Sequence, residues 1–255
     1  MTTVVAALRH VRGLDKLDHR CIDCFEQMFE DGGVASNLDT IAQLRSRMAG
    51  MQDGMPQLPL ETHPALAGLV QLRAGGSYSV DSASLALALL AGPSKAGGWC
   101  AAVGVGDFGA EAAYALGIDL DRTVLVPDPG DQWLEVTAAL VDVATVVLVK
   151  PQGRVPERVA EKLGARLRKR SAALVALVGP GSDWPRCEVR LTTREPMWTG
   201  VGEGHGHLRA RRILVEAQRG SAPPRRGALW FPAEDQTYRR AESTVAAVPE
   251  VEVAS

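Results

Sequence analysis

Short, uninterrupted apolar runs alternate with helical segments between residues 69 and 178. Runs such as Val146–Val149 and Ala172–Val178 consist wholly of aliphatic residues, so they are apolar on both faces. A strand of this kind must be covered on both sides, which is typical of a parallel sheet flanked by helices. The pattern therefore predicts an α/β fold with a mostly parallel central sheet.

The rest of this region follows the same alternation. We expect strands at Leu69–Arg73, Trp99–Val103 and Thr123–Val126, each followed by a helix. After Cys187 no helical pattern recurs, and the remaining apolar stretches are predicted to be strands. These would extend the same sheet with antiparallel strands at its C-terminal end, at residues 189–193, 209–218 and 227–231.

The pattern divides the chain into four parts. Residues 1–51 contain two amphipathic stretches and are expected to form a helical N-terminal arm. Residues 52–68 contain three prolines and little apolar periodicity, which is typical of a linker. We place the α/β domain at residues 69–232 and a flexible tail at residues 233–255.

Composition indicates the class of protein and the cellular compartment to be expected. Of the 255 residues, 46% are hydrophobic and 23% are charged, which is ordinary for a soluble globular protein. No apolar run is long enough to cross a bilayer, and four cysteines are too few for a disulfide framework. Cys21 and Cys24 lie on the apolar stripe of a predicted helix, so we expect core cysteines and no metal site. We expect a cytoplasmic protein without a membrane partner.

The turn before the first long helix occupies the position at which an α/β nucleoside-triphosphatase binds phosphate. Such a loop needs glycines, a lysine for the phosphates and a Ser or Thr for magnesium. Gly75 and Gly76 are present, but Ser82 stands in the place of the lysine and Ala83 in that of the magnesium ligand. Lys150 stands where a triphosphatase has a metal-binding aspartate. We therefore predict a degenerate phosphate loop, no cofactor, no catalytic residues and no ATP hydrolysis.

A second glycine-rich turn favours a different function. Gly104, Gly106 and Gly109 have the GxGxxG spacing, follow a predicted strand and precede a helix. Asp128, at the end of the next strand, is placed to bind a ribose. The alternative is therefore an NAD(P)-binding Rossmann-type module or oxidoreductase.

Basic residues gather in two places. Between residues 205 and 240 there are eight arginines and three carboxylates, a net charge of +5 in a chain whose total is −2. A second set recurs every four residues along the helix predicted near residues 156–169 and so lies on one helix face. Both surfaces suit an acidic partner or a DNA backbone. The candidate contact residues are Arg158, Lys162, Arg166, Arg170, Arg209, Arg211, Arg212, Arg225 and Arg226.

Three segments resemble, in order and spacing, the core of the RecA ATPases. They are ASLALALLAG (83–92), WCAAVGVGDFGAEAAYALGIDLDRTVLVPDP (99–129) and VTAALVDVATVVLVKP (136–151). The closer likeness is to the ImuA group of RecA-like proteins. Residues Met197–Pro232 resemble the closing strands of that group. The resemblance implies a RecA-like fold, and a role in bacterial damage-induced mutagenesis.

The same resemblance implies a set of partners. Proteins of this group assemble with an ImuB-like pseudo-polymerase and, through it, with an error-prone polymerase. A RecA-type enzyme also needs a glutamate near residues 104–106, where Asp107 is the nearest acid. We therefore expect a non-catalytic adaptor for translesion DNA synthesis. DNA is a further candidate partner, as is a second copy bound through the N-terminal helices.

Overall fold

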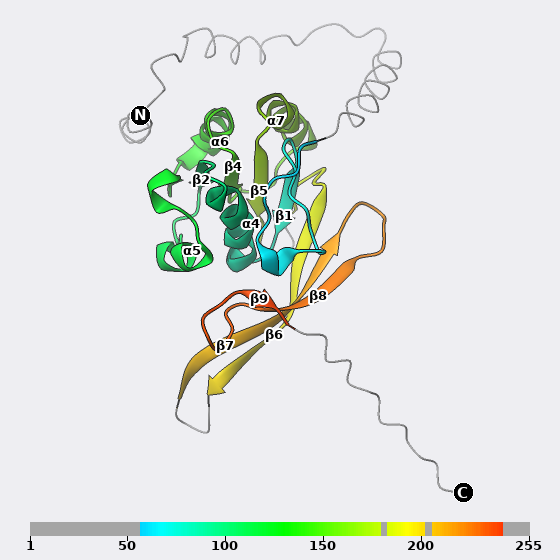
Figure 1. Ribbon diagram of the computed structural model, residues 1–255. Helices are drawn as coiled ribbons and strands as arrows, with labels where there is room; N and C mark the ends of the chain where they lie inside the picture. Colours follow the sequence, from blue (N-terminus) through cyan, green and yellow to red (C-terminus); the bar gives the residue numbers. More distant parts are fainter. Residues whose placement is uncertain (1–56, 180–182, 202–205, 242–255) are drawn as a thin grey trace, which may run out of the picture. The chain divides into compact units, whose positions relative to one another are not determined.

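Figure 1 shows the computed structural model, which describes residues 57–179, 183–201 and 206–241. The chain separates into two units, and the second begins at Leu58 and contains every helix and strand named below. The predicted N-terminal helices, with Cys21 and Cys24, lie outside the described residues. Among the described residues, no helix is both long and apolar enough to span a bilayer.

The described strands form one nine-stranded sheet in the order β3-β2-β4-β5-β1-β6-β7-β8-β9. The pairs from β3 to β6 are parallel, and those from β6 to β9 are antiparallel. The strands are β1 (Ser77–Val80), β2 (Cys100–Val103), β3 (Thr123–Val126), β4 (Val146–Val149), β5 (Ala173–Leu177), β6 (Val189–Val201), β7 (Gly206–Gln218), β8 (Arg225–Trp230) and β9 (Arg239–Arg240).

Four α-helices cover the two faces of the parallel strands. They are α4 (Ala83–Lys95), α5 (Ala110–Leu116), α6 (Trp133–Val141) and α7 (Glu157–Arg170), with 3-10 turns η1 (Pro64–Leu66), η2 (Leu120–Arg122) and η3 (Gly130–Gln132). One core cluster joins α4 and α5 to alternate strand positions such as Ala102 and Leu148. The intervening positions, such as Val147, point to the opposite face, toward α6 and α7. Burial on both faces explains the uninterrupted apolar runs.

The predicted fold class is confirmed. The central sheet is mostly parallel, helices flank it, and antiparallel strands follow at the C-terminal end. Helix α4 lies at the centre of one face, and ten of its residues are buried. This helix is apolar all round because it packs against the sheet and is itself covered by the segment that precedes β1.

The prediction of a strand at Leu69–Arg73 is wrong, because the first strand is Ser77–Val80. Leu69 and Leu72 are buried, but in an irregular segment that covers the sheet. The hydroxyl of buried Tyr78 accepts a hydrogen bond from the Arg73 amide (2.7 Å) and donates one to the Gln71 carbonyl (3.3 Å). A short apolar run is ambiguous in this way, since covering segments bury side chains as strands do.

Contacts of the described α/β domain continue on both sides of residues 69–232. Leu66 is fully buried although it lies within the predicted linker, and Arg240 donates to the Ala67 carbonyl at 2.9 Å. At the other end, Ala233 and Ala241 are buried and β9 pairs with β8, so the described domain continues to residue 241. The rest of the predicted tail lies outside the described residues.

Candidate functional site

The structure separates the residues of the predicted phosphate loop. Gly75 and Gly76 precede β1, whereas Ser82 and Ala83 follow it at the start of α4. The two groups therefore lie at opposite ends of a four-residue strand. Between β1 and α4 there are two residues, Asp81 and Ser82, and no room for a phosphate-binding loop. The loop is absent, and not merely altered at its lysine.

Residues of the antiparallel strands occupy the start of α4. The Asp81 carboxylate accepts the Thr193 amide of β6 through both oxygens, at 2.9 and 3.0 Å. Arg211 of β7 donates to the Ser84 hydroxyl at 2.9 Å, and its guanidinium lies 5.5 Å from the ring centre of Trp198. Burial lowers the pKa of Arg211, and its Nε has no hydrogen-bond partner. These contacts hold β6 and β7 against the helix.

An ion pair joins the ends of two parallel strands nearby. Lys150, directly after β4, lies 3.6 Å from the carboxylate of Asp107, which follows β2. Both side chains are largely exposed, so the pair contributes little to stability. Lys150 thus provides a cation at the position where a triphosphatase has a metal-binding aspartate. Among the described residues there is no group of three or more metal-ligating side chains.

The rival dinucleotide turn lies at the end of β2. Gly104 has a positive φ of 74°, and a Cβ there would come within 2.8 Å of the Lys150 carbonyl oxygen. Gly106 and Gly109 meet no such constraint, since their nearest neighbours are at 3.9 and 3.6 Å. The following helix α5 has seven residues, and Asp128 is exposed. The glycine at residue 104 is explained by packing against the chain itself.

Two arginines of the basic stripe on α7 join this helix to α6. Arg166 binds Asp142 through two bonds of 2.8 and 2.6 Å, and Arg170 binds the same carboxylate at 3.1 Å. Asp142 directly follows α6, so these contacts join the two helices on one face of the sheet. Burial raises the pKa of Asp142, but the hydrogen bonds and charges of the two arginines lower it by more. The pKa therefore lies below its usual value. Arg158 is exposed near the start of the helix.

The C-terminal arginines fall into two groups. Those near the body of the sheet bind carboxylates: Arg226 and Arg194 both pair with Glu216, and Arg190 pairs with Asp183. Arg239 of β9 pairs with Asp235, four residues before it. Arg225 donates to the Gly68 carbonyl. In the described residues, no ion pair joins a carboxylate to Arg209, Arg211 or Arg212. Sequence predicted the basic cluster but not this division.

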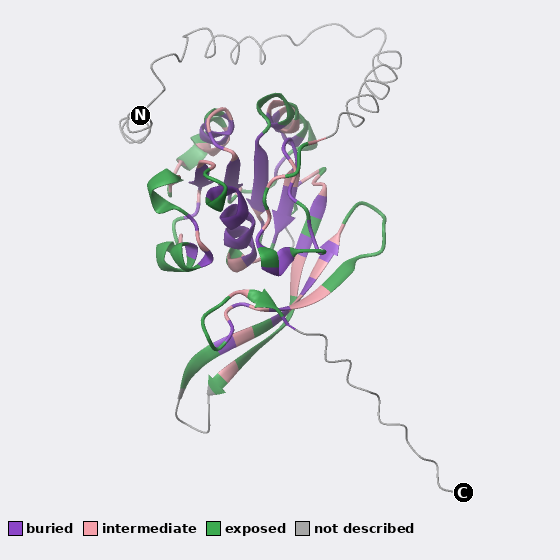
Figure 2. Cartoon of the chain, viewed as in Figure 1, coloured by how far each residue is buried: buried purple, intermediate pink, exposed green. Residues whose placement is uncertain are grey.

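These three arginines lie on the outer part of the β6–β7 hairpin, residues 197–201 and 206–212, which we call the arm. Figure 2 shows that most of the arm is exposed. Met197, Trp198 and Leu208 on it are 60%, 47% and 53% exposed. Register places Met197 opposite Arg212 and Trp198 opposite Arg211. Because neighbouring residues of a strand face opposite ways, both faces of the arm carry an apolar and a basic side chain.

A second exposed apolar surface lies at the β3 edge of the sheet. β3 pairs with β2 alone among the described strands, and Leu125 on it is 42% exposed. Tyr114 on α5 is 73% exposed. The neighbouring loops carry exposed Asp121 and Asp128. This β3 edge is therefore apolar with acidic neighbours, whereas the arm is apolar and basic.

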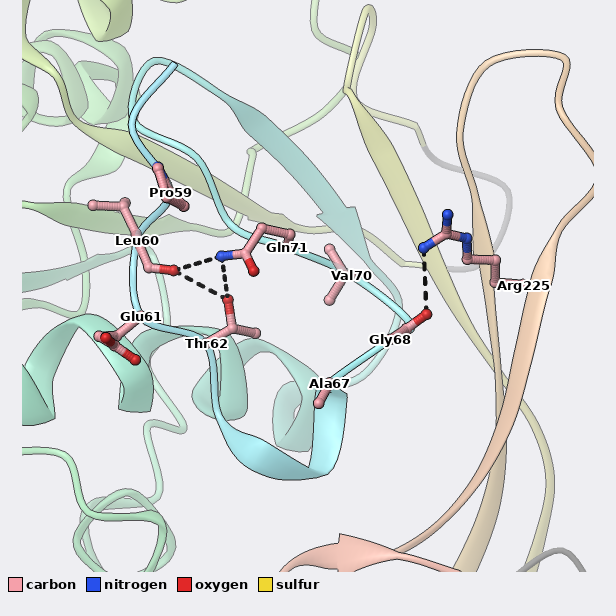
Figure 3. A pocket seen from close by; sticks show the side chains of 9 residues that line it. All are labelled: Pro59, Leu60, Glu61, Thr62, Ala67, Gly68, Val70, Gln71 and Arg225. Atoms are coloured by element: carbon pink, nitrogen blue, oxygen red, sulfur yellow. Dashed lines mark hydrogen bonds between the residues drawn. The ribbon is translucent and has the colours of Figure 1, made fainter. Parts of the chain in front are cut away.

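A groove of about 470 Å³ lies outside both surfaces, between the two limbs of the segment that precedes β1. In Figure 3, Gln71 reaches across it and donates to the Leu60 carbonyl and the Thr62 hydroxyl, and Arg225 lies at its other end. The polar groups that line it bond mainly to each other. These hydrogen bonds therefore hold the covering segment together.

We expect no phosphate release from ATP by the full chain. The reason is the two-residue β1–α4 connection, which leaves no backbone cradle for phosphates, and the presence of Lys150 in place of a metal-binding acid. The measurement is a colorimetric phosphate assay with ATP and magnesium. Release that exceeds the buffer blank and disappears in Ser82→Arg, which blocks the start of α4, would contradict this prediction.

Comparison with known proteins identifies relatives over the same region. Residues 65–186 match the family model of the MT3502 N-terminal domain. Over 171 residues the chain is 33% identical to the uncharacterized protein Rv3395c of Mycobacterium tuberculosis (strain ATCC 25618 / H37Rv); the alignment covers 66% of this chain and 80% of that protein. The family-model match contains the five parallel strands that begin the sheet and ends before β6, so the arm lies beyond it.

Proposed function

The chain belongs to the family of the mycobacterial protein Rv3395c, and from this premise we propose that it is a non-catalytic, RecA-like adaptor for translesion DNA synthesis. In this proposal it binds an ImuB-like, polymerase-related protein in the cytoplasm and reaches the error-prone polymerase through it. The proposal rests on the ImuA-like sequence segments described above and on the fold that those segments form.

The observation that carries the proposal is the state of the α4 N-terminus. In an α/β nucleoside-triphosphatase this is where backbone amides bind phosphate. Here Asp81 binds Thr193 and Arg211 binds Ser84, so the strands of the same chain use these groups for packing. In this proposal the domain derives from a nucleotide-binding domain, and the side chains at this position contact its own β6 and β7 instead of a ligand. Such a domain is suited to binding proteins and not to catalysis.

An adaptor also needs surfaces that its own chain leaves uncovered. The β3 edge and the arm both expose large apolar side chains, which mark interaction sites when they occur together with charged residues. The β3 edge is the first strand of the sheet order, whereas the arm belongs to β6 and β7. The first has acidic neighbours and the second is basic. DNA is a second candidate ligand of the basic surfaces.

The proposal predicts a specific partner and phenotype. From DNA-damaged cells of the source organism, affinity capture of the tagged full chain should recover a polymerase-related protein, identified by mass spectrometry. A deletion strain should show a damage-induced mutation frequency several-fold lower than the parent strain, restored by the intact gene. Recovery of metabolic enzymes alone, together with an unchanged mutation frequency, would contradict the proposed function.

A further inference from the structure

We propose that the arm is the docking surface for an acidic, partly apolar protein segment, and that the partner of the adaptor supplies this segment. The inference rests on the proposed function for the identity of the partner only. Its chemistry rests on Met197, Trp198, Leu208, Arg209 and Arg212.

Arginines along this sheet differ in whether they bind a carboxylate of the same chain. Near the body of the sheet, Arg194 and Arg226 both bind Glu216 of the same chain. On the arm, within the described residues, Arg209 and Arg212 bind none, although both are exposed. A guanidinium forms its strongest contacts with a carboxylate or a phosphate, commonly through two parallel hydrogen bonds. The arm thus presents the donors of such contacts without their acceptors.

The residue types around the arm favour a protein over a nucleic acid as its ligand. The described residues from 183 to 241 contain no lysine, and all their basic side chains other than histidine are arginines. Protein interfaces are enriched in Arg, Met and Trp and depleted of Lys, whereas phosphate backbones are contacted by both Lys and Arg. Met197 and Leu208 are aliphatic and more than half exposed. These side chains suit the apolar residues of a peptide better than a sugar–phosphate backbone.

Contacts within the chain hold the arm in place before any partner binds. Trp198 packs under the guanidinium of Arg211, which also bonds to Ser84 at the start of α4. The backbone of Arg211 exchanges hydrogen bonds of 2.7 and 2.8 Å with Phe231 and Pro232 at the end of β8. A surface that is already ordered loses less conformational entropy on binding. Arg211 is therefore a residue that positions the arm, and it is not a suitable test variant.

The charge of the arm also separates it from the β3 edge. The exposed Asp121 and Asp128 near that edge would repel an acidic segment, and charged residues beside an open strand discourage strand addition. An acidic segment is therefore attracted to the arm and repelled by the β3 edge. This complementarity assigns the partner segment to the arm.

The test compares capture of the polymerase-related protein by four forms of the full chain. Arg209→Glu/Arg212→Glu changes the arm, and Arg154→Glu/Lys169→Glu makes the same charge change at two exposed positions before and on α7 as a matched control. Tyr114→Glu changes the β3 edge. We expect the arm variant to bind the partner at least ten-fold more weakly, because each of these arginines loses a carboxylate contact. The other two variants should bind as the parent does. Lysine substitution of the acidic residues in the partner should restore binding to the arm variant.

A partner-free measurement separates failure of this inference from failure of the proposed function. A short fluorescein-labelled peptide in which glutamates alternate with leucines should bind the parent chain, measured by anisotropy, and bind Trp198→Ser and the arm variant at least ten-fold more weakly. Affinity should also fall between about 50 and about 200 mM salt, since salt screens exposed charges. If the peptide behaves so but capture finds no polymerase-related protein, the proposed function fails and the arm chemistry stands.

Two outcomes would overturn the inference. One is equal binding of partner and peptide by the parent chain and the arm variant. The other is loss of a fluorescein-labelled oligothymidine by the arm variant while partner and peptide still bind, which would assign the arm to single-stranded nucleic acid.

Discussion

Gly92→Ala is expected to lower the free energy of unfolding by about 2–3 kcal/mol, although alanine is the better helix former by about 1 kcal/mol. Gly92 is buried in α4, where the helix meets the segment that covers it. An added Cβ would overlap the carbonyl group of Glu61 and lie 2.8 Å from the Cα of Thr62. Both obstacles are backbone, so relief requires the covering segment to move away. Urea unfolding of the full chain measures the change.

The matched control is Gly164→Ala on α7. A Cβ there meets only the flexible end of Arg168, at 3.6 Å. The substitution should therefore raise the free energy of unfolding by about 0.5–1 kcal/mol through helix propensity alone. If both variants stabilise the protein, the covering segment is not packed against α4 as described.

Asp142→Asn is expected to lower the free energy of unfolding by about 2–3 kcal/mol near neutral pH. The Asp142 side chain is 10% exposed and binds Arg166 and Arg170, which are 28% and 41% exposed. Removing one partner of a buried pair costs about 3–5 kcal/mol, because a desolvated charge is left without compensation. Partial exposure lets both arginines regain water, which reduces the cost. Asp128→Asn, at an exposed position, should change stability by less than about 0.5 kcal/mol.

The effect of Asp142→Asn should depend on pH in one direction. The arginines hold the pKa of Asp142 below its usual value, so the folded state binds its proton less tightly than the unfolded state does. The stabilisation is fully present above the unfolded pKa of about 3.9 and is lost as pH falls through the lower folded pKa. The difference between parent and variant should therefore shrink at acidic pH, for example between pH 7 and pH 3. A difference that grows at low pH would contradict this account.

Much of the fold was predictable because the parallel strands are buried on both faces. Composition and flanking turns predict strands at Val146–Val149 and Ala172–Val178, and the structure has β4 and β5 there. Leu69–Arg73 was misplaced because the same signal arises wherever a segment is buried. The sequence pattern does not state whether a run of four apolar residues pairs with a neighbouring strand or covers one.

The candidate site was predictable only in part. The absence of a phosphate-binding lysine could be read from residues 75–84, as could the excess of arginine after residue 205. That Gly75 and Gly76 lie at the opposite end of β1 from α4 could not, because the strand was placed too early. The β3 edge was not predicted, since exposure of Leu125 depends on β3 having a described neighbour on one side only.

The sequence by itself determined the class of sheet, the residue types at the phosphate-loop positions and the sign of charge at the C-terminal end. These depend on which side chains occur and on their local period. The tertiary structure decided which arginines are already paired. Arg226 meets Glu216 across two strands and Arg166 meets Asp142 across two helices, whereas Arg209 and Arg212 project on the arm. Electrostatic contacts form between residues distant in sequence, so their pattern exists only after strand order and register bring them together.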